Sequence, residues 1–142
     1  MNETQFKYPD LRLGFENCPP QEYREIDTTA YRFVHEDSRH PNNFTPVQII
    51  KPQRSFQTDD ARCKALGLSF FKEHDTARQF FQRQMKYNPR YGKVVGNRIA
   101  FIQVAPNDGV ASEPERENFG HFTFHEYLWT DFSQKILSIE PV

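Results

Sequence analysis

The stretch GLSFFKEHDTARQFFQRQM, residues 67–85, predicts a strand followed directly by a helix. Its first five residues are small or apolar, which is typical of a short buried strand. Asp75 can cap a helix that begins near Thr76, and Asn88-Pro89 ends it because the residue before a proline disfavours the helical conformation. Apolar residues recur along one face of this helix, which we expect to be core, at Ala77, Phe80, Phe81 and Met85.

The segments on either side of this unit favour further strands. Residues 29–34 (TAYRFV) are rich in β-forming residues, and residues 98–104 (RIAFIQV) form a nearly continuous apolar run that predicts a central strand. Shorter strand candidates lie at 47–50, 121–124, 127–129 and 135–139. Because strands outnumber helices, we predict an α+β fold with a mostly antiparallel β-sheet core and one main helix.

The chain length of 142 residues suits a single domain. Residues 1–28 are polar and contain three prolines, so we interpret them as an irregular N-terminal arm, and residues 29–142 as a single α+β domain. Aromatic residues make up 15% of the chain, and 14 of them are phenylalanine. Large rings bury much area per residue, so a real core is expected although only 37% of residues are hydrophobic.

The overall charge and hydropathy argue against two classes of protein. The 18 basic and 19 acidic residues give a net charge of −1, so the basic stripe of a dedicated nucleic-acid binder is not expected. No window approaches the roughly 18 consecutive apolar residues of a membrane span. The sequence shows no signal-peptide pattern, and the predicted location is therefore cytoplasmic.

The two cysteines, Cys18 and Cys63, lie far apart in the sequence and have no CxxC partner. A zinc site built on them is therefore not expected. They could form one disulfide bond, but the reducing environment of the cytoplasm predicts free thiols instead.

Three segments occur in an informative order. Tyr31-Arg32 lies in the first predicted strand, the strand at 67–71 precedes the helix, and Glu126 opens an apolar segment that is followed by a turn, an aromatic residue and a closing strand. Over roughly residues 29–139 this order resembles the ADP-ribosyltransferase superfamily. Its members commonly carry an aromatic-Arg or aromatic-His pair in an early strand, a Ser or Tyr in a middle strand and a catalytic Glu in a late strand. The resemblance implies an ADP-ribosyltransferase-like fold that uses NAD as a substrate.

The resemblance also assigns roles to individual residues. Cleavage of the bond between nicotinamide and ribose has an oxocarbenium-like transition state, which a nearby carboxylate stabilises. A hydroxyl can hold that carboxylate, a guanidinium can bind the dinucleotide phosphates, and an aromatic face can stack on nicotinamide. The catalytic groups implied by the resemblance are Glu126 and Ser69. The NAD-binding groups implied by it are Arg32, Tyr31, Phe70 and Phe71.

The activity implied is that of an NAD-dependent ADP-ribosyltransferase or NAD glycohydrolase, in the role of a toxin or phage-conflict effector. Phe124 stands two places before Glu126, where arginine-modifying members have an acidic or amide residue, which argues against protein arginine as the acceptor. The acceptor, a protein or a nucleic acid, stays open. One alternative is a catalytically inactive module of the same fold that binds a nucleotide or a protein.

The histidines support a second alternative, a histidine-based phosphoesterase or ribonuclease. The segment His121-Phe122-Thr123-Phe124 has the His-x-Thr-x form that two-histidine phosphoesterases use twice, and it occurs once here. His121 and His125 are four residues apart, which on a helix could bind a metal. The flanking residues favour a strand, in which the two would lie about 13 Å apart, so no metal site is expected.

Overall fold

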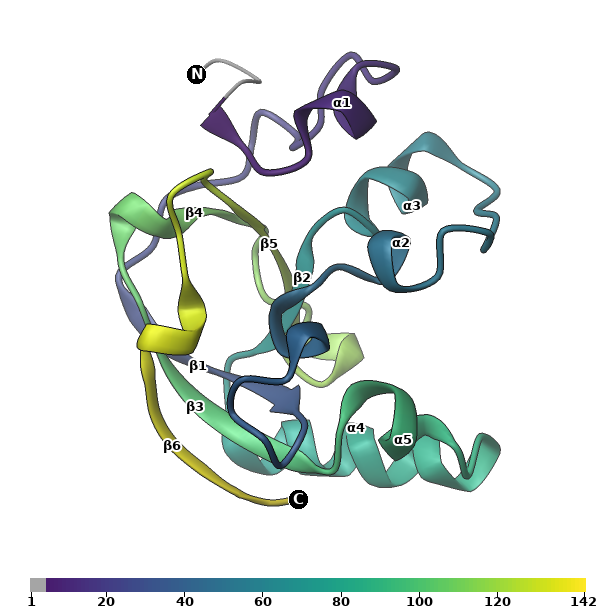
Figure 1. Cartoon of the computed structure of the whole chain (residues 1–142), viewed down its shortest axis with the longest axis vertical. Coiled ribbons are helices and arrows are strands. Elements are labelled where there is room, and N and C mark those ends of the chain that lie inside the picture. The colour runs from purple at the N-terminus through teal and green to yellow at the C-terminus, as the bar shows by residue number, and fades with distance from the viewer. Residues whose placement is uncertain (1–4) are drawn as a thin grey trace.

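A computed structural model describes residues 5–142. Its centre is a six-stranded sheet with the strand order β4-β5-β2-β1-β3-β6 (Figure 1). All five strand pairings in it are antiparallel. The strands are β1 (Thr28–Val34), β2 (Leu68–Phe71), β3 (Arg98–Val104), β4 (Gly109–Ala111), β5 (His121–Glu126) and β6 (Ile136–Pro141). The predicted α+β class with an antiparallel sheet is confirmed.

The helices of the described residues are short, with one exception. They are α1 (Pro9–Arg12), α2 (Val47–Ile50), α3 (Asp59–Lys64), α4 (His74–Tyr87) and α5 (Tyr91–Val95). Single 3-10 turns lie at Pro41–Phe44, Pro106–Asp108, Arg116–Asn118 and Phe132–Gln134. The strand and helix predicted from residues 67–85 correspond to β2 and α4, and α4 is the only helix longer than six residues in the described chain.

Two strand predictions were wrong. Residues 47–50 form α2 instead of a strand, because Pro46 leads the chain into a helical turn that the bond from Lys51 N–H to Val47 C=O closes at 2.8 Å. Residues 127–129 leave the sheet after β5, because Thr130 N–H donates to Tyr127 C=O at 3.1 Å and makes a turn.

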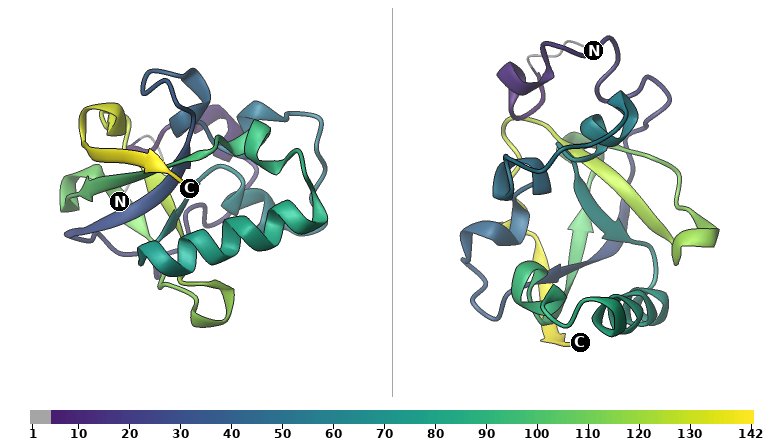
Figure 2. Two further views of the ribbon diagram at one scale, coloured as in Figure 1. Left: turned by 90° about the horizontal axis from the view of Figure 1, so that it is seen from below. Right: turned by 90° about the vertical axis from the view of Figure 1, so that its right-hand side faces the viewer.

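The sheet has apolar side chains on both faces. Helix α4 lies along one of them (Figure 2), where Ala77 and Phe81 of the helix pack against Phe33, Phe71 and Ile99. Phe80, which the helical pattern predicted to be buried, is half-buried together with Met85. A separate core cluster contains Phe70, Phe124 and Phe132 with smaller residues of β1, β2 and β3.

The sheet is least continuous between β1 and β2. Strand β1 pairs with β3 over all seven of its residues, whereas its pairing with β2 consists of the single position Tyr31 opposite Phe71. Strand β2 pairs with β5 over four residues. The sheet therefore opens between β1 and β2 next to this one pair.

The part of the predicted N-terminal arm that the structure describes is bound to the core. Phe6, Arg12 and Cys18 are buried, and Lys7 N–H donates to Glu126 C=O at 3.1 Å. A disulfide bond joins Cys18 to Cys63 of α3. The prediction of free thiols was wrong, because folding brings the two Cα atoms to 5.6 Å although 45 positions separate them in the sequence.

Candidate functional site

A small cavity of about 140 Å³ lies where the sheet opens between β1 and β2. Arg32 of β1 and Ser69 of β2 both line it, with Lys64 at the end of α3. The segment that contains α2 contributes apolar lining from Val47 and Ile50. The cavity thus combines two cationic side chains and a hydroxyl with an apolar wall.

Arg32 is held by backbone carbonyls on both sides of the opening. Its Nε donates to Asn43 C=O at 2.7 Å and its Nη1 donates to Ser69 C=O at 2.9 Å. Burial lowers the pKa of Arg32 to about 10, and the charge of Glu126 acts against this decrease. Arg32 is therefore cationic at neutral pH. A guanidinium has five N–H donors, so these two bonds leave others for a bound anion.

Ser69 contacts a histidine that lies on the adjacent strand. Its Oγ lies 2.9 Å from His121 Nε2, and His121 Nδ1 lies 3.5 Å from a Glu115 carboxylate oxygen. Burial lowers the pKa of His121, with smaller contributions from the charges of Lys64 and Arg32, while Glu115 acts in the opposite direction. In the neutral tautomer with its proton on Nδ1, facing Glu115, His121 can accept the Ser69 hydroxyl proton at Nε2.

Glu126 lies at the end of β5, away from the Ser69 hydroxyl. In the β2–β5 pairing Ser69 is opposite Thr123, so the side chains of Ser69 and Glu126 emerge on opposite faces of the sheet. Glu126 is 4% exposed, and its Oε2 lies 2.9 Å from Lys7 Nζ. Burial raises the pKa of Glu126, and Lys7 is the main influence that lowers it.

The structure therefore brings together two of the three principal predicted residues. Arg32 and Ser69 line one cavity, where Arg32 contacts the Ser69 backbone carbonyl, and the partner of the Ser69 hydroxyl is His121 instead of Glu126. Arg32 and Glu126 are close enough for the charge of each to affect the pKa of the other.

The predicted aromatic ligands for nicotinamide are occupied in packing. Phe70 and Phe71 are 0% and 1% exposed, so neither ring has a face open to a ligand, and the expected stacking role is not available to them here. Tyr31 is half-buried, stacks on Phe101 at 5.0 Å between ring centres and meets the edge of His74 at 5.4 Å.

Sequence reasoning missed the pairing of His121 with Ser69 and the participation of Glu115 and Lys64. His121 was noticed because of its His-x-Thr-x segment, but its neighbour depends on how β2 and β5 align. No local signal in the sequence gives that alignment.

A second polar cluster lies at the other end of β5, on the same face as His121. His125 Nδ1 lies 2.9 Å from Arg12 Nη1, beside the disulfide bond. His121 and His125 both lie in β5, as predicted, and each has its own partners.

No family model matches the chain, and no curated protein or solved structure matches it either. Within residues 5–142, no helix is both long enough and apolar enough to cross a membrane.

Proposed function

We propose that the chain is an NAD-handling enzyme, an ADP-ribosyltransferase or NAD glycohydrolase, with its site at the opening between β1 and β2. The observation that carries this proposal is the adjacency of β5, β2 and β1 in the sheet, which are the strands of Glu126, Ser69 and Arg32. The contact of Arg32 with Ser69 C=O beside a cavity supports it further.

In this proposal Arg32 binds phosphate oxygens in the ground state, since its guanidinium is preorganised by Asn43 and Ser69. The cavity of about 140 Å³ holds one ring or one phosphate group, so the remainder of NAD lies along its mouth. Two carboxylates are candidates to stabilise a developing oxocarbenium ion, although neither is part of the cavity lining in the described chain. Glu126 requires release from Lys7, whereas Glu115 is half-exposed beside His121.

The test is to incubate the protein with NAD, with and without cell extract as a source of acceptor, and to quantify released nicotinamide. Arg32→Ala should weaken NAD binding, and Glu126→Gln should leave binding intact and lower turnover at least about 100-fold. Glu115→Gln tests the other carboxylate, and Glu117→Gln on the exposed turn is the matched control. The proposal fails if the wild-type protein neither binds nor cleaves NAD.

A second candidate is a histidine-based hydrolase that acts on phosphate or other anionic esters. The observation that favours it is the 2.9 Å contact between Ser69 Oγ and His121 Nε2 at a cavity that Arg32 and Lys64 make cationic. His121 would act as the base, Ser69 as the nucleophile, and Glu115 would orient the imidazole.

This candidate is separated from the first by the residues on which activity depends. Hydrolysis of p-nitrophenyl phosphate should be lost in Ser69→Ala and in His121→Gln and should persist in Glu126→Gln. Because the pKa of His121 is lowered, its basic form and the activity should persist below pH 6.5. Absence of both activities would leave the catalytically inactive binding module.

The cytoplasmic location and the role as a toxin or phage-conflict effector are part of this proposal. A disulfide bond in a cytoplasmic protein is unusual unless it has a transient, redox-active role. The Cys18–Cys63 bond is therefore a candidate for a redox-active role of its own.

A further inference from the structure

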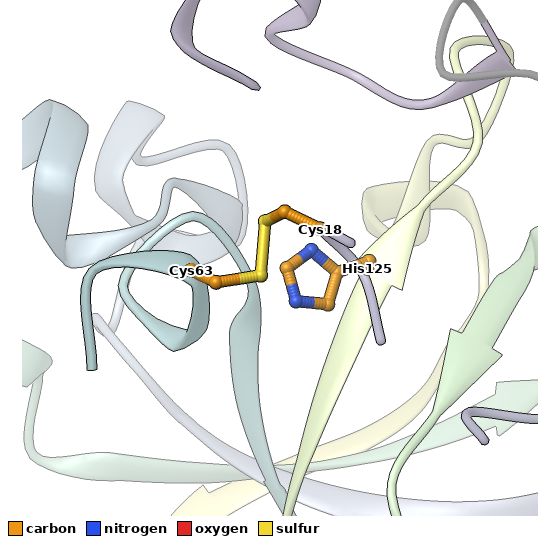
Figure 3. A group of neighbouring side chains, drawn as sticks. All are labelled: Cys18, Cys63 and His125. Carbon is orange, nitrogen blue, oxygen red and sulfur yellow. A yellow bond between two sulfur atoms is a disulfide. The ribbon is translucent and has the colours of Figure 1, made fainter. Parts of the chain in front are cut away.

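Four buried side chains from separate segments meet beside β5. Arg12 of α1, Cys18 of the arm, Cys63 of α3 and His125 of β5 are each no more than 4% exposed. Figure 3 shows the His125 ring next to the disulfide bond, and one ligand atom from each cysteine and from His125 lies within 4.8 Å of the others.

Arg12 determines the proton arrangement of His125. A guanidinium only donates, so His125 Nδ1, 2.9 Å from Arg12 Nη1, must accept. The proton of the neutral ring is therefore on Nε2, which is buried and has no hydrogen-bond partner among the described residues. Burial, with the charge of Arg12, lowers the pKa of His125 to about 3, so the ring is neutral at physiological pH.

The Arg12 guanidinium and the protonated Nε2 of His125 are both hydrogen-bond donors, so they favour an anion beside the His125 ring and disfavour a metal cation. A metal at Nε2 would displace the proton that Arg12 has placed there, and it would add positive charge next to a buried guanidinium. A Cys18 thiolate, in contrast, would be stabilised by the positive charge of Arg12, whose Nη1 lies 3.5 Å from Cys18 Sγ.

The two cysteines differ in their access to a reactant. Cys18 lines a cavity of about 450 Å³, together with Phe6, Tyr23 and Val110. Cys63 of α3 is not part of the lining of that cavity in the described chain.

From this arrangement we propose that Cys18 and Cys63 form a thiol–disulfide exchange site, with Cys18 as the nucleophile, Cys63 as the resolving cysteine and a low-molecular-weight or peptide disulfide as the substrate. This inference is independent of the function proposed for the cavity between β1 and β2.

The exchange proceeds in two balanced steps. In the reduced protein the Cys18 thiolate attacks one sulfur of the substrate disulfide, which forms a mixed disulfide and releases the other sulfur as a thiolate. Cys63 then gives its proton to a departing thiolate and attacks Cys18 Sγ, which releases the second substrate thiolate. The substrate disulfide is reduced to one thiol and one thiolate, which takes its proton from water, and the cysteine pair is oxidised. A substrate dithiol reverses both steps.

Acidic groups near Cys18 oppose the stabilisation of its thiolate by Arg12. Glu16 lines the same cavity, and the charges of Asp60 and Glu22 contribute to the raised pKa of Tyr23. Tyr23 lies 5.7 Å from the His125 ring between ring centres. Arg12 is buried and in contact with Cys18, whereas Glu16 and Asp60 are exposed, so we expect the cation to dominate.

The first test measures the reactivity of Cys18 in the Cys63→Ser variant, as the rate of alkylation by iodoacetamide against pH. The expected midpoint is at least about one unit below the 8.5 of a free thiol, and Arg12→Gln should raise it. Arg62→Gln in α3 is the matched control, because this exposed arginine pairs with Asp59 and should not change the midpoint. A midpoint at or above 8.5, or one unaffected by Arg12→Gln, overturns the proposal.

The second test uses the unaltered chain and does not depend on whether Arg12→Gln folds. A purely structural disulfide across 45 positions should change the unfolding equilibrium constant about 1000-fold between the oxidised and reduced proteins. A stabilised thiolate in the reduced native state reduces that difference, so we expect less than about 100-fold at pH 8 in urea titrations. A larger difference assigns the bond to structure alone.

Discussion

At the scale of single residues, the burial of His125 couples the stability of the protein to pH. Its pKa is lowered from 6.5 to about 3, so between these values the unfolded chain binds a proton that the folded chain does not. Stability from this residue is therefore fully present above pH 6.5 and decreases as the pH falls.

We predict that the free energy of unfolding decreases by about 2 kcal/mol between pH 7 and pH 5 because of His125. His125→Gln keeps an acceptor for Arg12 and removes the titrating group, so this variant should lose most of that dependence. Urea titrations at the two pH values measure both proteins. An equally steep decrease in His125→Gln would show that another group is responsible.

The contact between Ser69 and His121 shows how a site forms from residues that are ordinary in the sequence. Ser69 lies in a four-residue strand and His121 begins another, and each has a simple structural interpretation on its own. The alignment of β2 with β5 places Phe71 opposite His121, and Ser69 lies two positions earlier in β2 on the same face. A proton-transfer pair thus follows from strand alignment.

At the scale of elements, β2 approaches β5 closely at Gly67, just before β2 begins. A Cβ atom at this position would lie 2.8 Å from Thr123 Cγ2 and 3.0 Å from Phe124 C=O. The contact with the Phe124 oxygen cannot relax without moving β5, because that oxygen belongs to the backbone.

We predict that Gly67→Ala destabilises the fold by about 1–3 kcal/mol, the usual effect of overpacking. Gly14→Ala is the control, because a Cβ there meets nothing within 4 Å, and its effect should stay within about 0.5 kcal/mol. Thermal or urea unfolding of the two variants gives the comparison. Equal effects would contradict close packing at Gly67.

The packing of α4 on the sheet gives a second prediction at this scale. Phe81 is 8% exposed and contacts Phe33, whereas Phe80 is half-buried. We expect Phe81→Ala to lower the free energy of unfolding by about 3–5 kcal/mol and Phe80→Ala by about half as much or less. Urea titrations test the order, and a greater loss for Phe80→Ala would show that α4 is rotated from the position described.

At the scale of the whole molecule, the sequence predicted what short-range patterns determine. The unit of β2 and α4 was predictable because a short apolar run and helical spacing are local patterns. The predicted cap was wrong, since α4 begins at His74 after Glu73, and Asp75 lies in its first turn. The strand β3 matches residues 98–104 because a continuous apolar run has few other places in a small fold.

The features that were not predictable depend on distant contacts. The α2 helix has the composition of a strand, with Val47, Ile49 and Ile50, but among residues 5–142 it pairs with no strand, and it closes on itself after Pro46. The Cys18–Cys63 bond joins residues whose approach depends on the course of the arm. The same applies to the Lys7–Glu126 pair, which brings the arm over a residue that sequence analysis had assigned to the site.

The contact between Lys7 and Glu126 gives the last prediction, which concerns how the arm is held on the domain. The Glu126 side chain is 3% exposed and Lys7 is 25% exposed, so removal of the cation leaves a buried carboxylate without its ion pair. Lys7→Met keeps the length of the side chain and should lower the free energy of unfolding by about 2 kcal/mol at pH 7, less than for a fully buried pair because water reaches Lys7. The effect should be smaller at pH 4, because burial already raises the pKa of Glu126 and a protonated carboxyl needs no cation.

In a double-mutant cycle, Glu126→Gln should remove most of the effect of Lys7→Met, with a coupling of about 1–2 kcal/mol. If the two substitutions are additive at pH 7, the ion pair does not hold the arm, and the hydrogen bonds and buried rings of residues 5–27 do so alone.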